Sequence, residues 1–375
     1  MRSLRPLAAA AIAAILTGFP PAALAEDGGG DAADWAKRIE ALVTGLEREE
    51  REFYDALKRS APTEPGVAPA PPDMTKHPGV KRIPEFVEIA RGAKGTEPGL
   101  RAAHWLLTRG STLPGGEGLE KEAFRLLVED GRDCAALVHA LPTLRHQHFR
   151  FGAEEVESAL VAIAAKSADA EVRAAAEVQR AAWRLEDPKA SAERKADGRR
   201  IAEEVLERHG KTRAARRARG LLNEQDGLQV GKQAPDFEAV DVDGETVRLS
   251  KFRGSVVIVD FWTGWGRANC PQAPLWAKAV ERLNGRPLVF LAVCCEEGGA
   301  AEARKAAKDC GVPGRILVGG GRDGDLCAAW NIRVWPTLFV IDADGIVRWS
   351  GPAGEWERVV EEWIRVAEAK AGGKK

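Results

Sequence analysis

Apolar and polar residues follow a helical period through the N-terminal part of the chain. Between Asp34 and about Asn223, apolar residues recur every three or four positions, which predicts amphipathic helices. The segment DWAKRIEALVTGLEREEREFYDALKRS ends before APTEPGVAPAPPD, whose prolines cannot continue a helix. We therefore interpret residues 61–73 as a flexible linker. The shorter helices expected after it suggest helical hairpins, without the strict period of a tetratricopeptide repeat.

A different pattern begins after NEQDG. The segment QVGKQAPDFEAVDVDGETVRLSKFRG predicts short strands around a DVDG turn, and SVVIVDFW predicts a buried strand. Helices are predicted at 271–283 and 300–309, and they alternate with strands in PLVFLAVCC and RILVG. A short helix in LCAAWN, a strand segment in TLFVIDADGIVRW and a final helix from Gly354 follow. Such alternation implies parallel pairing through right-handed crossovers, and the DADG turn adds an antiparallel hairpin.

These two patterns predict an α plus α/β protein with two domains. An all-helical domain is expected at 26–225, including the linker, and an α/β domain at 229–372. The chain has 375 residues, of which 45% are apolar, so it is long enough for two hydrophobic cores.

Residues 1–25 have the pattern of a secretory signal peptide. Arg2 and Arg5 precede the apolar run LAAAAIAAILTGF, and ALA stands before Glu26 as a cleavage site. The run is shorter than the roughly 20 residues that a spanning helix needs. We therefore expect an exported chain in the periplasm or cell envelope that does not span the membrane once cleaved. An uncleaved N-terminal anchor is the alternative.

The charge of the chain argues against nucleic acid as a partner, and its cysteines allow disulfide bonds. Fifty-five basic and 56 acidic residues give a formal charge of −1, which provides no broad field to attract nucleic acid. Disulfides persist in an oxidising compartment, and the six cysteines leave many pairings open. The alternative is that several are small buried hydrophobic residues.

Three features of the C-terminal part stand in a fixed order: GKQAPDFEAVDVDGETVRLSKFRGSVVIVDFW, then Pro274, then VWPTLFVIDADGIV. On these residues, the region from Val230 to about Lys370 resembles the thioredoxin-like redoxins of the bacterial envelope. It is most similar to the branch that groups thiol:disulfide interchange proteins with alkyl hydroperoxide reductase/thiol-specific antioxidant domains. The resemblance implies a thioredoxin-like fold and thiol-disulfide or antioxidant oxidoreductase activity.

The family places WCxxC at the start of the first crossover helix. Unpaired N–H groups and the helix dipole there lower the pKa of the first thiol, and the second cysteine resolves the mixed disulfide. In this chain Trp265 is in register, but Gly266 and Asn269 occupy the two cysteine positions. The sequence therefore predicts the fold and argues against dithiol exchange through this motif.

Cys270 follows the degenerate motif. Asn269 is a good N-cap, so a helix that begins slightly late would place Cys270 at its first position, with some dipole assistance. A lone activated thiol forms mixed disulfides or pairs with another cysteine. The candidate disulfide partners are Cys294, Cys295, Cys310 and Cys327. Cys294 and Cys295 are adjacent on a strand, so their sulfurs should point to opposite faces. A packing role for Cys270 is the alternative.

Pro336 in VWPT matches the proline that the family holds in the cis form beside its active cysteines. A cis bond exposes the preceding backbone for strand-like pairing with a bound peptide. The residues expected to bind peptide are Trp262, Trp265, Trp335, Pro336 and Thr337. A purely structural turn, with tryptophans that pack in the core, is the alternative.

Asp260 lies in an otherwise apolar strand, where burial would raise its pKa. In relatives, the acid at the matching position assists proton transfer to the buried cysteine. Cys270 and Asp260 are therefore the catalytic candidates. The alternative for Asp260 is a carboxyl that is hydrogen-bonded to backbone or water.

No metal or cofactor is predicted. The HQH at 146–148 has no carboxylate or thiol at ligand spacing, so a solvated basic turn is favoured. Two hypotheses for function follow. The first is a redoxin limited to single-thiol chemistry through Cys270, with a thiol reductant as partner. The second is a non-catalytic module that binds a peptide or protein at the cis-proline groove.

Overall fold

The computed structural model describes residues 30–60, 70–264, 272–321, 324–352 and 356–372. The predicted signal peptide and most of the predicted linker lie outside these residues. Backbone contacts divide the chain into two compact units, Met1–Trp183 and Arg184–Lys375.

The first unit is built of helices, as the apolar spacing predicts. They are α2 (Gly30–Arg59), α3 (Pro78–Gly92), α4 (Glu97–Thr108), α5 (Leu119–Arg125), α6 (Leu141–His146), α7 (His148–Phe151), α8 (Ala153–Lys166) and most of α9 (Ala170–Leu185). Side-chain caps define several starts: the Thr96 hydroxyl accepts from the Gly99 amide at the start of α4. The helices α2, α3 and α4 pack on one another around the stacked rings of Phe86 and Trp105, whose centroids are 3.8 Å apart.

A buried ion pair lies within this helical core. Glu50 on α2 is only 4% exposed, and its two carboxylate oxygens accept from Nη1 of Arg109 at 2.9 and 3.1 Å. Burial raises the pKa of Glu50, and the charge of Arg109 opposes that increase. His77, which caps the start of α3, contributes Nε2 at 3.6 Å from Glu50. Since a buried carboxylate needs its partner, this pair ties α2 to the end of α4.

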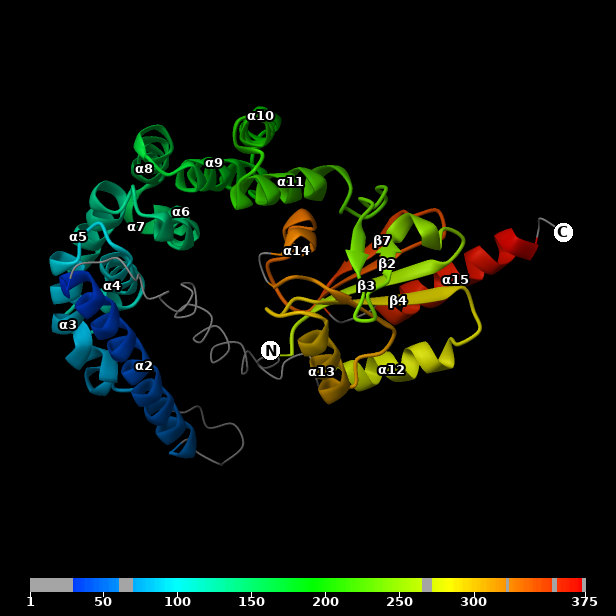
Figure 1. Ribbon diagram of the computed structural model, residues 1–375, viewed down its shortest axis with the longest axis horizontal. Coiled ribbons are helices and arrows are strands. Elements are labelled where there is room, and N and C mark those ends of the chain that lie inside the picture. The colour runs from blue at the N-terminus through cyan, green and yellow to red at the C-terminus, as the bar shows by residue number, and fades with distance from the viewer. Residues whose placement is uncertain (1–29, 61–69, 265–271, 322–323, 353–355, 373–375) are drawn as a thin grey trace. The chain divides into compact units, whose positions relative to one another are not determined.

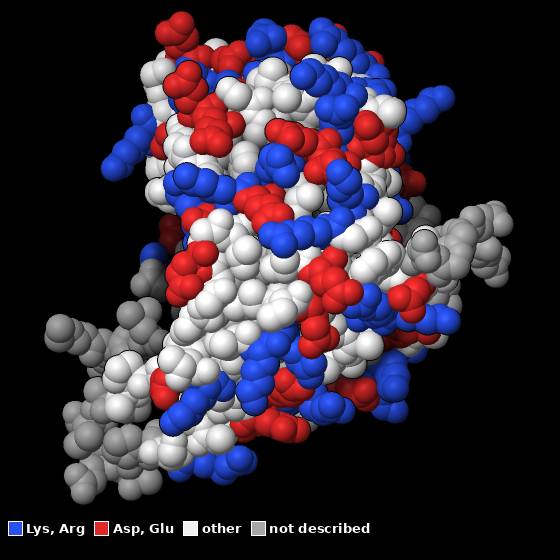
Figure 2. All heavy atoms as spheres, turned by 90° about the vertical axis from the view of Figure 1, so that its left-hand side faces the viewer, with Lys and Arg blue, Asp and Glu red and all other residues white. Residues whose placement is uncertain are grey.

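The surface charges are mixed in sign. On the face drawn in Figure 2, acidic and basic side chains are interspersed. Ion pairs such as Arg82–Glu49 and Arg91–Glu122, at 2.5 and 2.7 Å, join neighbouring helices of the first unit. This pattern agrees with the near-zero net charge of the sequence.

The second unit contains a five-stranded sheet in the order β5-β4-β3-β6-β7. Its strands are β3 (Val256–Trp262), β4 (Leu288–Cys294), β5 (Arg315–Val318), β6 (Thr337–Ile341) and β7 (Val347–Gly351), and β1 (Glu238–Val240) pairs with β2 (Thr246–Arg248) in a separate hairpin. Strands β3, β4 and β5 are parallel, whereas β6 is antiparallel to both β3 and β7. This confirms the predicted thioredoxin-like sheet and the α plus α/β class.

Two hydrophobic layers cover the two faces of the sheet, because residues of β3 alternate between them. Helices α12 (Ala273–Arg282), α13 (Ala300–Cys310) and α15 (Trp356–Gly372) pack on one face. The β1–β2 hairpin and the short helix α14 (Asp325–Ala329) pack on the other, around Trp330 and Phe261. The elements predicted from RILVG, LCAAWN and TLFVIDADGIVRW are thus confirmed. Helix α12 is described from Ala273 rather than from the predicted start at 271.

The two predicted turns share one construction. In DVDG, Oδ1 of Asp241 accepts from the amides of Asp243 and Glu245, and in DADG, Oδ1 of Asp342 accepts from those of Asp344 and Ile346. A glycine with positive φ closes each turn. Both hairpins are therefore encoded locally by an aspartate and a glycine.

Two helices precede the sheet in the second unit. Helices α10 (Ala192–His209) and α11 (Arg213–Asp226) pack on each other, and α11 packs on α14. Close packing requires a small residue: a Cβ on Gly220 would lie 2.0 Å from the carbonyl oxygen of Ala328. The predicted domains at 26–225 and 229–372 follow secondary structure, whereas the compact units follow packing, which is why α10 and α11 group with the sheet.

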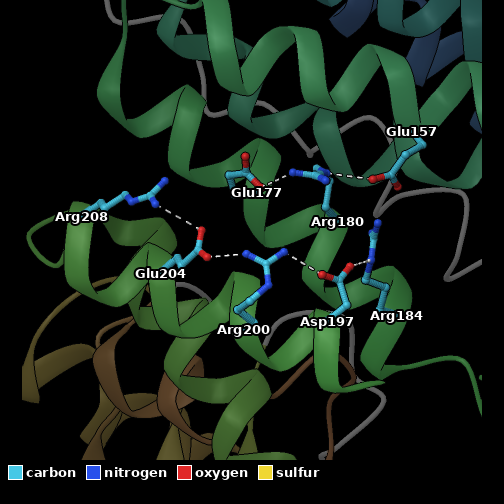
Figure 3. Close-up of polar contacts among 8 residues, drawn as sticks. All are labelled: Glu157, Glu177, Arg180, Arg184, Asp197, Arg200, Glu204 and Arg208. Carbon is cyan, nitrogen blue, oxygen red and sulfur yellow. Dashed lines mark hydrogen bonds and ion pairs between the residues drawn. The ribbon is translucent and has the colours of Figure 1, made fainter. Parts of the chain in front are cut away.

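Figure 3 shows ion pairs formed by residues of α8, α9 and α10. Asp197 contacts Arg184 at 2.6 Å and Arg200 at 2.7 Å, and Glu204 links Arg200 to Arg208. Separately, Arg180 contacts Glu157 and Glu177. Most of these pairs are half-exposed, so each adds little stability on its own.

Within the described residues, no helix combines the length and apolar character needed to cross a bilayer.

Candidate functional site

The candidate site lies where β3 and β4 end. Trp262 and Cys294 are the last pair of this parallel ladder, and the next amide, that of Cys295, donates to the carbonyl oxygen of Trp262 at 2.8 Å. Just beyond β3, the Gly264 amide donates to Oε1 of Glu296 at 2.5 Å. The carboxyl ends of parallel strands are where such sheets place their sites.

The proline predicted to be cis is confirmed as cis. The Trp335–Pro336 bond has this form, and the following residue, Thr337, pairs with Phe261 near the end of β3. The Thr337 hydroxyl donates to the carbonyl oxygen of Val334 at 2.7 Å, which closes the turn that carries the proline. The loop at 334–336 therefore borders the end of β3.

The motif that the sequence analysis predicts to be degenerate lies outside the described residues. Trp265, Gly266, Asn269 and Cys270 all fall in the range 265–271. Their predicted roles remain predictions that rest on the sequence.

Asp260 is fully buried on β3, as predicted, and burial raises its pKa well above the ordinary value. Neither carboxylate oxygen has a hydrogen-bond partner among the described residues. The residues opposite Asp260 on the strands β4 and β6 are the apolar Ala292 and Leu338, which offer no side-chain partner to the carboxyl. At neutral pH this environment favours the protonated acid.

The apolar surface at the site differs from the prediction. Trp262 does not line it: the side chain is 0% exposed and packs with Trp276 and Trp356 beneath α12 and α15. Trp335, Pro336 and Thr337 are partly exposed, and Val334 is 65% exposed. Sequence reasoning missed Val334, although its place directly before the Trp-Pro pair was a signal.

Three of the four cysteines proposed to pair with Cys270 are free thiols. Cys294, Cys295 and Cys327 are unbonded and buried, so the prediction is wrong for them. Burial raises the pKa of Cys294 to about 11 and that of Cys295 well above its ordinary value. Cys310, at the end of α13, is disulfide-bonded. The side chains of Cys294 and Cys295 enter the two different core layers, as predicted for adjacent residues of a strand.

A clamp that the sequence did not suggest holds the segment before the cis proline. Oε2 of Glu224 on α11 accepts from Nδ2 of Asn331 at 2.5 Å, and Oε1 accepts from Arg333 at 3.0 Å. Arg333 also pairs with Glu186 at 2.6 Å. Helix α11 therefore helps to position the loop at 334–336.

The described part of the chain holds no group of three or more His, Cys, Asp or Glu side chains arranged to bind a metal ion.

Comparison with known proteins assigns the sheet-containing unit to a family. The AhpC/TSA family model matches residues 230–350. The thiol-disulfide oxidoreductase ResA of Geobacillus kaustophilus (strain HTA426) is 30% identical over 128 residues, which cover 34% of this chain and 72% of that protein. The chain belongs to the thioredoxin-like redoxin family. A ResA protein of Bacillus cereus is 22% identical over 146 residues, covering 39% of this chain and 83% of the relative.

Solved structures that match this redoxin also bear names of thiol-disulfide proteins. The thioredoxin domain of a thiol-disulfide oxidoreductase from Bacteroides vulgatus has a TM-score of 0.34 at 20% identity and covers 37% of this chain and 99% of its own. A putative thiol:disulfide interchange protein DsbE from Chlorobium tepidum has a TM-score of 0.32 at 25% identity, with 38% and 99% covered.

Proposed function

We propose that this redoxin catalyses thiol–disulfide exchange, with Cys270 as the exchanging sulfur and Asp260 as the residue that moves its proton. The observation that carries the proposal is the burial of Asp260 without any hydrogen-bond partner among the described residues.

A carboxyl in that position costs stability. Burial without compensating hydrogen bonds is unfavourable even for the neutral acid, and replacement by an apolar residue would remove the cost. Strongly perturbed acids of this kind cluster at functional sites, where a proton must be held at neutral pH and then released. The family names of the relatives agree with this chemistry.

The state of the cysteines supports a second sulfur for the reaction. The sequence has six cysteines, of which Cys134, Cys294, Cys295 and Cys327 are free and Cys310 is disulfide-bonded. Cys270 is the one cysteine that remains, so we infer that Cys270 and Cys310 form a redox couple in place of the absent CxxC.

The proposed cycle is balanced in electrons. The Cys270 thiolate attacks a substrate disulfide and releases one substrate thiolate, which takes up a proton. The Cys310 thiol then attacks the mixed disulfide, releases the second substrate thiol and leaves an oxidised Cys270–Cys310 pair. A thiol reductant restores the two thiols. Asp260 accepts or donates the proton of the sulfur that is exchanged.

The test is reduction of a protein disulfide, such as that of insulin, by dithiothreitol with the purified chain as catalyst. Cys270→Ser should abolish turnover, and Cys310→Ser should trap the mixed disulfide. Cys134→Ser, in the helical unit, is the matched control and should keep the activity. Asp260→Asn should lower the rate about 100-fold at neutral pH and change its pH profile. Unchanged turnover by Cys270→Ser would refute the proposal.

A binding module remains the second candidate, because Val334 is 65% exposed beside the partly exposed Trp335. Exposed aromatic and apolar side chains are common anchors for a partner. If the wild-type chain shows no turnover, saturable binding of unfolded polypeptide that is weakened by Trp335→Ala would favour this function. Leu275→Ala, at a 58% exposed position on α12, is the matched control.

We also propose that the chain is exported and cleaved before Glu26, on the pattern of residues 1–25. Sequencing the N-terminus of the secreted product from an expressing bacterium tests this. A product that retains Met1 in the cytoplasm would contradict it.

A further inference from the structure

Two cysteines outside the degenerate motif meet in the core of the second unit. Cys295 follows the last residue of β4, and Cys327 lies on α14. Their Sγ atoms are 2.8 Å apart. Both side chains are 0% exposed and belong to the core layer that contains Phe261 and Trp330.

The separation is short for two thiols that merely pack. The optimal non-bonded distance between two carbon atoms is already about 3.5–4.0 Å, and sulfur is the larger atom. A disulfide bond is about 2.05 Å long, so the two sulfurs need to approach by only about 0.8 Å. The fold therefore already brings the two sulfurs into contact.

The neighbouring cysteine does not share this arrangement. Cys294 directs its side chain into the opposite core layer, with Ala303 and Ala307. The chain therefore offers a matched pair of adjacent cysteines, of which one meets Cys327 and the other packs beneath α13.

We propose that Cys295 and Cys327 form a second, internal redox pair that closes to a disulfide and fastens α14 to the end of β4. In the reaction, one cysteine attacks a low-molecular-weight disulfide such as glutathione disulfide and releases one glutathione. The other cysteine attacks the resulting mixed disulfide and releases the second glutathione. The two cysteines lose two electrons and two protons, and the oxidant gains them.

This bond would affect the loop that borders the candidate site. Trp335 packs against the same core layer, and its side chain interacts with the Cys295 thiol. Helix α14 also carries the Ala329 carbonyl that accepts from Asn223 on α11 at 2.9 Å. Closing the pair therefore fixes the segment between α14 and the cis proline, independently of whether the proposed exchange at Cys270 occurs.

Burial determines how slowly the bond forms. Desolvation raises the pKa of the Cys295 thiol, which disfavours the reactive thiolate. Oxidation of the folded chain should therefore be slow, whereas oxidation during refolding is not limited in this way.

The experiment uses the full chain by two routes: incubation of the reduced, folded protein with glutathione disulfide, and refolding of the reduced, denatured protein in a glutathione redox buffer. Acid quenching, alkylation in denaturant, digestion with trypsin and mass spectrometry then map the bonds. We expect a peptide containing Cys295 linked to one containing Cys327, and an apparent melting temperature about 5–15 °C above that of the reduced protein.

Single-cysteine variants show which cysteines form the bond. Cys294→Ala should retain the linked peptides, whereas Cys295→Ala and Cys327→Ala should lose them and, after oxidation, should melt at a lower temperature than the oxidised wild-type chain. Circular dichroism of each reduced variant reports whether it folds. If Cys295 and Cys327 are both fully alkylated after either route in the wild-type chain, or if the link persists in Cys295→Ala, the proposal is overturned.

Discussion

Glu224 on α11 accepts a hydrogen bond from the side chain of Asn331, 2.5 Å away, at the start of the segment that leads to the cis proline. The same carboxylate accepts from Arg333. Glu224 thus holds the loop that follows α14. Figure 1 shows α11, which carries Glu224, beside α14. The redoxin unit is therefore larger than the region matched by the family model, which begins at residue 230.

Replacing Glu224 tests this extended unit. Glu224→Ala leaves the amide of Asn331, which is 8% exposed, without this acceptor. An unsatisfied buried donor costs about 1–3 kcal/mol, so the free energy of unfolding should fall by that amount. Urea denaturation monitored by tryptophan fluorescence measures it. Glu207→Ala, at an exposed position of α10, should change stability by less than about 0.5 kcal/mol. Equal effects of the two variants would contradict the clamp.

Asp260 should make stability depend on pH in an unusual direction. Burial raises its folded-state pKa, so above the unfolded value of about 3.9 the unfolded chain releases a proton that the folded chain keeps. This contribution lowers stability as pH rises, by about 1.4 kcal/mol per pH unit, until the folded pKa is reached. Asp260→Asn should remove it. Unfolding free energies of both proteins at pH 5, 6, 7 and 8 should therefore diverge with pH, and parallel curves would refute the assignment.

The disulfide at Cys310 has a predicted partner. Four of the other cysteines are free, which leaves Cys270. Digestion without reductant should release one peptide pair that contains both residues. In Cys270→Ser, Cys310 should become available to alkylation, and the unfolding free energy should fall by about 2–4 kcal/mol. A bond from Cys310 to any other cysteine would contradict the proposed redox couple.

Arg109 should be essential for the helical unit. It pairs with Glu50, which is 4% exposed, so Arg109→Ala leaves a buried carboxylate without this partner. Such a change costs about 3–5 kcal/mol. The double variant Glu50→Gln/Arg109→Met should recover part of the loss, because it removes the unpaired charge. Thermal unfolding of the three proteins tests this, and a double variant less stable than Arg109→Ala would speak against the mechanism.

Much of the second unit could be predicted from local patterns. The continuous apolar run that became β3, the two aspartate–glycine turns and the opposed directions of Cys294 and Cys295 each depend on nearby residues, so they were predicted correctly. Trp262 was predicted to bind peptide at the surface but lies in the core, because a tryptophan at the end of a strand can face either side. The choice depended on α12 and α15, which cover it.

The sequence by itself determined the order of helices and strands and the thioredoxin-like class, because periodicity and residue identity are local properties. Only the tertiary structure decided which polar and sulfur atoms meet. The burial of Asp260 without a hydrogen-bond partner among the described residues depends on the layers around it. The contact of Cys295 with Cys327 and the clamp of Glu224 on Asn331 join residues far apart in the chain. Their distances depend on how layers pack, and local spacing does not encode that packing.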